Sequence, residues 1–289
     1  MAQNHQTPQG DSLIRRFREG RVLAGFMDEV HFNSFAQIHV PHFEAHERAD
    51  LESRVAAARL ACARLGPADT SDVVIRPLIH PRVEELEALP AFQNAFGSTS
   101  YQFAWIDPSR VVPLQVWTAS NTYSLGEDED ERVELCMPLP TVPPVEVTGS
   151  RAGEFHVISV LSSAPHGTRF NLTIDPNGSV IAGPATHLNL LQVVHIGSIY
   201  LAVNGTHRLF EAVTSQVSEL PALVRESPSG NALTGLPELG YEGFSVPFVF
   251  GARRPPLISD LNSSASITMT LRERRYGYQV LAAPLLLPI

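Results

Sequence analysis

Apolar residues in the first hundred positions recur at helical spacing. Between residues 44 and 65, Leu51, Val55 and Ala58 follow one another at intervals of three and four, with charged residues between them. The pattern predicts an amphipathic helix that ends before Gly66, because glycine commonly follows the last helical turn.

A second helix is expected over residues 81–96. Pro81 suits a first helical turn, and Val83, Leu86 and Leu89 repeat on one face. Pro90 should divide this helix, since proline lacks the N–H group that a helix interior needs. We therefore expect residues 1–100 to form a mostly helical N-terminal region.

Residues 101–289 show a different sequence pattern, in which short runs of β-branched and aromatic residues alternate with turn-forming residues. The sequence Asp-Pro-Asn-Gly at 175–178 predicts a hairpin turn. A second hairpin is expected near the end of the chain, with arginines in its turn. Strands are expected at 101–106, 111–117, 155–161, 172–174, 180–182, 267–271 and 278–282. With the helical N-terminal region, these strands predict an α+β fold.

Two polar stretches interrupt the strand-rich part. Residues 126–131 are glycine followed by five acidic residues, which predicts a solvated loop. Residues 138–144 contain four prolines and predict an extended linker.

Residues 198–225 suggest a binding site. An apolar strand leads to an Asn204-Gly205 turn, a helix follows, and a strand resumes at 221–225. The first turn of a helix presents unpaired N–H groups and a favourable dipole to an anion. We expect Asn204, Gly205, Thr206 and Arg208 to bind a phosphate. His207 would act as an acid, a base or a further donor.

This segment resembles the ParB/sulfiredoxin-like superfamily, whose members carry a strand, a Gly-x-His-Arg or related Gly-x-x-Arg turn, a helix and a second strand. Residues 106–114 are similar to the first strand and proline turn of that fold. The resemblance implies a small mixed sheet, with the residues between the two pieces forming an insertion that contains the 175–178 hairpin.

In that superfamily the turn handles nucleotide phosphates. The resemblance therefore implies a nucleotide with Mg²⁺, or another phosphate ligand, and hydrolysis, phosphotransfer or nuclease activity. Thr206 occupies the position of the sulfiredoxin cysteine, which excludes sulfiredoxin chemistry because a hydroxyl cannot form the required thiosulfinate. Neither a helix-turn-helix nor a basic module, as ParB uses on DNA, is evident. The carboxylates to test as metal ligands are Asp107 and Glu211.

Two other interpretations stay open. An Asn-Gly turn before a helix also occurs for structural reasons alone. The chain could instead be a noncatalytic protein-interaction subunit of a bacterial multi-protein system, with its proline-rich segment and exposed strands as contact surface.

Composition bears on the source of the protein, its partners and its localisation. All 21 cationic side chains are arginine, which is typical of a GC-rich genome, so we expect a bacterial source. The net charge of −9 disfavours nonspecific nucleic-acid binding, although arginines at 253–254 and 272–275 leave a nucleic-acid partner open. With no signal sequence or long apolar window, we expect a cytoplasmic protein that does not cross a membrane.

Cysteine and histidine spacing does not predict a metal site. Cys62 and Cys136 are far apart in the sequence and belong to no ligand cluster. His42 and His46 are spaced as two metal ligands on a helix would be, but no third ligand accompanies them. We assign no metal.

Overall fold

The computed structural model describes most of the chain. The described residues are 17–40, 45–119, 124–140, 145–152, 155–162, 170–174, 180–184, 188–226, 243–272 and 276–282.

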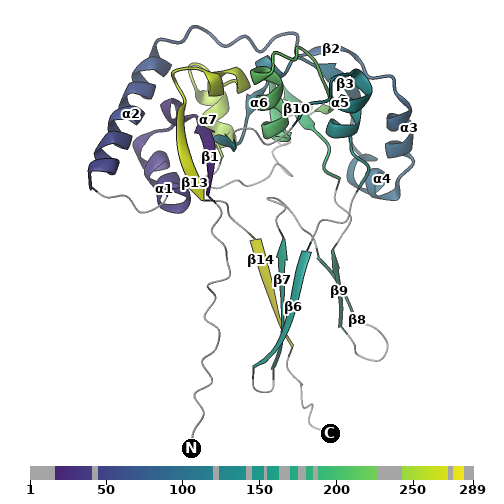
Figure 1. Cartoon of the computed structure of the whole chain (residues 1–289). Helices are drawn as coiled ribbons and strands as arrows, with labels where there is room; N and C mark the ends of the chain where they lie inside the picture. The colour runs from purple at the N-terminus through teal and green to yellow at the C-terminus, as the bar shows by residue number, and fades with distance from the viewer. Residues whose placement is uncertain are drawn as a thin grey trace, which may run out of the picture.

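Helices dominate the N-terminal part and strands the remainder, which confirms the α+β class (Figure 1). The helices are α1 (Glu29–His39), α2 (Ala45–Ala63), α3 (Pro81–Glu87), α4 (Pro90–Phe96), α5 (Glu129–Cys136), α6 (Thr206–Thr214) and α7 (Val246–Gly251), with short 3-10 turns η1 (Ala24–Phe26), η2 (Pro108–Arg110) and η5 (Ile258–Asn262). The strands are β1 (Phe17–Val22), β2 (Val74–Pro77), β3 (Tyr101–Ile106), β4 (Val112–Pro113), β5 (Trp117–Ala119), β6 (Val145–Ala152), β7 (Phe155–Ser162), β8 (Phe170–Ile174), β9 (Val180–Pro184), β10 (Gln192–Ile196), β11 (Ile199–Asn204), β12 (Leu220–Glu226), β13 (Ile267–Arg272) and β14 (Tyr276–Ala282).

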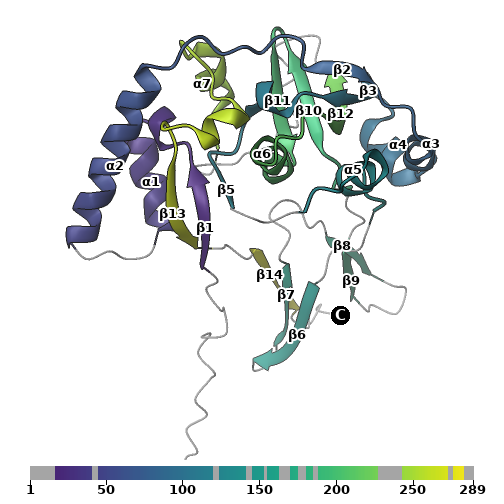
Figure 2. The same cartoon turned by 45° about the horizontal axis from the view of Figure 1, so that its top comes forward.

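A mixed six-stranded sheet forms the centre of the fold, in the order β2-β3-β12-β10-β11-β4. The β10–β12 and β11–β4 pairs are parallel, whereas the β2–β3, β3–β12 and β10–β11 pairs are antiparallel. The sheet supplies much of the core, where Val193, Leu201 and Leu223 have no exposed surface. Helix α6 crosses in front of β10 and β11 in Figure 2.

A second sheet has the order β13-β1-β5 and lies beside α1 and α2 (Figures 1 and 2). Its central strand β1 comes from the N-terminal region, and both of its neighbours come from beyond residue 100. Strand β2 likewise pairs with β3 in the six-stranded sheet. The N-terminal region and the remainder therefore share their sheets.

Two predicted helices are confirmed. Helix α2 spans most of the 44–65 prediction and buries Leu51, Val55 and Ala58. Pro90 divides the 81–96 prediction into α3 and α4 and begins the second of them.

The acidic residues at 127–131 are exposed, as predicted, but only the first part of the run is a loop, because α5 begins at Glu129. Asp128 is the N-cap of α5, its carboxylate accepts the Glu131 backbone N–H at 2.9 Å, and the next acidic residues occupy the first helical turn. Carboxylates at a helix N-terminus interact favourably with the macrodipole, so the run favours a helix start. Val133 and Cys136 bury the other face of α5.

One predicted hairpin is confirmed and one is wrong. β8 and β9 pair antiparallel, with Ile174 opposite Val180; the turn at 175–178 lies outside the described residues. The expected C-terminal partners do not pair with each other. β13 pairs with β1, and β14 pairs with β7 in a third sheet of order β14-β7-β6. Each strand was identified by its alternation, which carries no information about its partner.

None of the helices within the described ranges is long and apolar enough to span a bilayer.

Candidate functional site

The strand–turn–helix–strand unit predicted at 198–225 is present as β11, α6 and β12. Gly205 is the N-cap of α6, with a φ of 97° in the left-handed region that favours glycine. No side chain caps the helix there. Leu209 and Ala212 bury one face of α6 completely, and this packing fixes the direction in which its first turn points.

Asn204 anchors the turn. Its Nδ2 donates to the Leu190 carbonyl at 2.8 Å and to Oδ1 of Asn189 at 3.2 Å. These bonds attach the segment before β10 to the turn, so the Asn204 amide group is engaged inside the protein.

Arg208 points into the protein, and its side chain does not reach solvent as a phosphate ligand would. Only 3% of the residue is exposed. Nη1 donates to the carbonyls of Leu135 (2.9 Å) and Cys136 (3.3 Å), and Nη2 donates to the carbonyl (3.0 Å) and Oδ1 (3.2 Å) of Asn189. The guanidinium thus holds the last carbonyls of α5, where a cation also complements the helix dipole. The phosphate contact predicted for Arg208 is replaced by this internal role.

His207 is held in a defined orientation by β5. Its Nδ1 accepts the Ala119 backbone N–H at 3.1 Å and lies 2.7 Å from the Thr118 hydroxyl. A ring nitrogen that accepts from a backbone N–H carries no proton, so these contacts assign the proton of the neutral ring to Nε2. β5 therefore fixes both the tautomer and the orientation of the half-buried imidazole.

Thr206 is 5% exposed at the start of α6. The indole N–H of Trp117, whose ring lies 5.6 Å from that of His207 between centroids, is buried without a hydrogen-bond partner among the described residues. A buried donor without a partner carries a cost in free energy, which a bound acceptor would remove.

No reactive thiol accompanies the turn. Cys136 lies beneath Arg208 with no exposed surface, and burial raises the pKa of its thiol to about 11 despite the nearby Arg208 and Arg132 charges. At neutral pH the thiol stays protonated, and the thiolate is the nucleophile in cysteine chemistry.

Asp107 and Glu211 are occupied by local contacts. Asp107 caps η2 through the Ser109 N–H and pairs with Arg110 at 3.1 Å, and Glu211 accepts from the Ser215 hydroxyl at 3.2 Å. Across the described ranges, no group of three or more His, Cys, Asp or Glu side chains is arranged to hold a metal ion.

No family model, curated protein or solved structure matches the chain. The site is therefore interpreted from its own geometry.

The sequence predicted which residues begin α6 but not which residues surround them. Thr118 and Ala119 set the His207 tautomer, and Asn189 holds Arg208 and Asn204. These contacts join segments 15 to 89 residues apart, and no local motif signals them.

Proposed function

We propose that the first turn of α6 binds the phosphate of a nucleotide or of another phosphate ligand in a bacterial, cytoplasmic protein. The observation that carries the proposal is the start of α6, where Gly205 is the N-cap and no side chain of the described residues caps the helix. Thr206 and His207 occupy the first turn there, and Nδ1 contacts with Thr118 and Ala119 fix the orientation of the His207 ring. A helix start of this kind suits an oxyanion.

Each turn residue then has a separate role. Gly205 and Thr206 contribute backbone N–H groups and Thr206 its hydroxyl, while Asn204 and Arg208 hold the turn in place from behind. His207 is held beside the turn as a neutral ring, since protonation of Nδ1 would break its bond with Ala119. In a hydrolysis, phosphotransfer or nuclease reaction, such a ring would stabilise developing negative charge as a hydrogen-bond donor, because loss of its remaining proton would leave an imidazolate.

The order of strands also supports the proposed kinship with the ParB/sulfiredoxin-like superfamily. β3 and β4 flank the β10, β11 and β12 strands in one small mixed sheet, and the 145–184 strands lie between them in sequence as an insertion.

Thermal shifts with ATP, CTP, GTP and inorganic pyrophosphate, with and without Mg²⁺, test the proposal. Binding to the native state alone raises Tm by mass action, and we expect at least one of these ligands to raise the Tm of the wild type. Thr206→Val and His207→Phe should each keep the Tm of the unliganded protein within a few degrees of the wild type. Each should lose most of the ligand-induced rise in Tm, because the loss of one donor should raise Kd by about tenfold or more. Thr214→Val, the same substitution at the exposed last residue of α6, is the matched control and should respond as the wild type does. Absence of a shift with every ligand contradicts the proposal.

A noncatalytic protein-interaction subunit is the second candidate, and β2 favours it. This strand forms one edge of the six-stranded sheet. Ile75 on the strand is 45% exposed, and Ile79, two residues after it, is 93% exposed. An exposed strand edge with apolar side chains is a template for a partner strand. If this candidate is right, partners copurified from the native host will be retained by Thr206→Val and lost by Ile75→Glu/Ile79→Glu. Retention by both variants contradicts it.

A further inference from the structure

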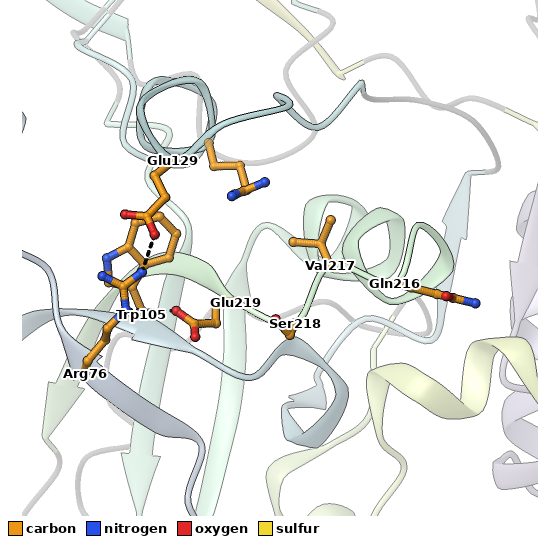
Figure 3. Close-up of a pocket in the computed structure, with 8 residues that line it drawn as sticks. Arg76, Trp105, Glu129, Gln216, Val217, Ser218 and Glu219 are labelled. Carbon is orange, nitrogen blue, oxygen red and sulfur yellow. Dashed lines mark hydrogen bonds and ion pairs between the residues drawn. The ribbon is translucent and has the colours of Figure 1, made fainter.

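A cavity of about 370 Å³ lies at the opposite end of α6 from the turn (Figure 3). Helices α5 and α6 run antiparallel, because Arg208 joins the start of α6 to the end of α5, whereas the cavity joins the start of α5 to the segment after α6. The side chains used below are Arg76, Trp105, Glu129, Arg132, Val217 and Glu219.

Arg76 is fully engaged on one wall. Its Nη2 pairs with Oε1 of Glu129 at 2.7 Å and its Nε with Oε2 of Glu219 at 3.0 Å. Its guanidinium carbon also lies 4.5 Å from the centre of the Trp105 ring, a cation–π contact. Figure 3 shows Arg76 with Trp105 and Glu129 on one side of the cavity and Glu219 next to them.

Arg132 has no such counter-charge. Its Nη1 makes only long contacts to the carbonyls of Gly126 (3.3 Å) and Glu127 (3.4 Å). Its Nε is buried without a partner, and within the described part of the chain Nη2 has no hydrogen bond and the side chain no ion pair. A guanidinium whose Nη2 has no acceptor and no counter-charge favours an anionic oxygen.

The carboxylates also retain binding capacity. Oε1 of Glu219 and Oε2 of Glu129 accept no hydrogen bond from any described residue, since Arg76 uses the other oxygen of each. Two guanidinium and two carboxylate groups make the cavity neutral overall. A ligand with net charge would leave one group uncompensated, whereas a ligand with one positive and one negative end would satisfy both sides.

We propose that this cavity binds a small zwitterion with a carboxylate at one end and an ammonium at the other. The carboxylate pairs with Nη2 of Arg132. The ammonium donates to the free oxygens of Glu219 and Glu129, and the carbon chain lies along Trp105 and Val217. The site is independent of the phosphate proposed at the α6 turn, and neither requires the other.

Isothermal titration with α-alanine, β-alanine, γ-aminobutyrate and 5-aminovalerate tests the site, since the series lengthens the distance between the two charges. We expect one chain length to bind best. Propionate and propylamine, each carrying one charge, should bind at least about tenfold more weakly than that zwitterion. The proposal is overturned if propionate or propylamine binds as tightly as the best zwitterion, or if no zwitterion binds at concentrations up to about 10 mM.

Arg132→Gln and Glu219→Gln should each weaken the best zwitterion by about tenfold or more, while Arg64→Gln, an exposed arginine on the segment after α2, should leave the affinity unchanged. If Arg132→Gln unfolds the protein, the Nε–H resonance of Arg132 in the wild type supplies the test. It should move on titration and saturate with the heat signal, and a resonance that stays in place overturns the assignment. Full retention of pyrophosphate binding in Arg132→Gln would confirm that the two sites are separate.

Discussion

Replacing Arg208 with methionine should lower the free energy of unfolding by about 3 kcal/mol in the absence of any ligand. The guanidinium is 3% exposed and donates to three backbone carbonyls, two of them at the end of α5. Methionine fills similar space but leaves these acceptors without that donor, and an unsatisfied buried polar group costs more than the net gain of one hydrogen bond. Urea denaturation followed by circular dichroism measures the change.

Arg64→Met is the matched control. Arg64 is exposed, its side chain makes no hydrogen bond or ion pair within the described residues, and it should tolerate the same substitution within about 0.5 kcal/mol. An Arg208→Met protein as stable as Arg64→Met would mean that the guanidinium does not brace α5, and would restore its interpretation as a surface ligand.

Gly205→Ala should cost about 3 kcal/mol, from two sources. The φ of 97° is strained for any residue with a Cβ, and an added Cβ would lie 2.9 Å from Cδ1 of Leu191. Leu191 is fully buried, so its side chain has little room to move. The same denaturation experiment measures this change.

Gly197 separates the two sources, because its φ is 63° but nothing lies within 4 Å of an added Cβ. Gly197→Ala should therefore cost only about 1 kcal/mol, for the backbone conformation alone. Equal costs at Gly205 and Gly197 would show that the turn does not pack closely on Leu191.

Local signals in the sequence were sufficient where structure depends on neighbouring residues. Pro90 divided α3 from α4 as expected, and the Asn204-Gly205 turn opened α6. The start of α5 was missed because its charges were taken as a mark of solvation, although Asp128 is a favourable N-cap. β1 gave no signal that could name β13 and β5 as its partners, because strand pairing depends on contacts distant in the sequence.

In the candidate site, too, the sequence predicted local features but not contacts between residues that are distant in the sequence. A Gly-x-x-Arg pattern identifies residues at a helix start but does not say whether the arginine faces solvent or the interior. The answer depends on Asn189 and on the end of α5, which precede Arg208 by 19 and 73 residues. His207 gained a defined tautomer from β5, 88 residues upstream. The roles of both side chains are therefore tertiary properties.

The most direct test of the account is a titration with pyrophosphate followed by backbone and imidazole ¹⁵N NMR. In the free protein, His207 should show a protonated Nε2 and an unprotonated Nδ1. On titration, the amide signals of Gly205, Thr206 and His207 and the Nε2–H signal should shift together and saturate at one Kd. Signals at the α6 turn that do not move, or a His207 ring protonated at Nδ1 in the free protein, would contradict the proposed anion site.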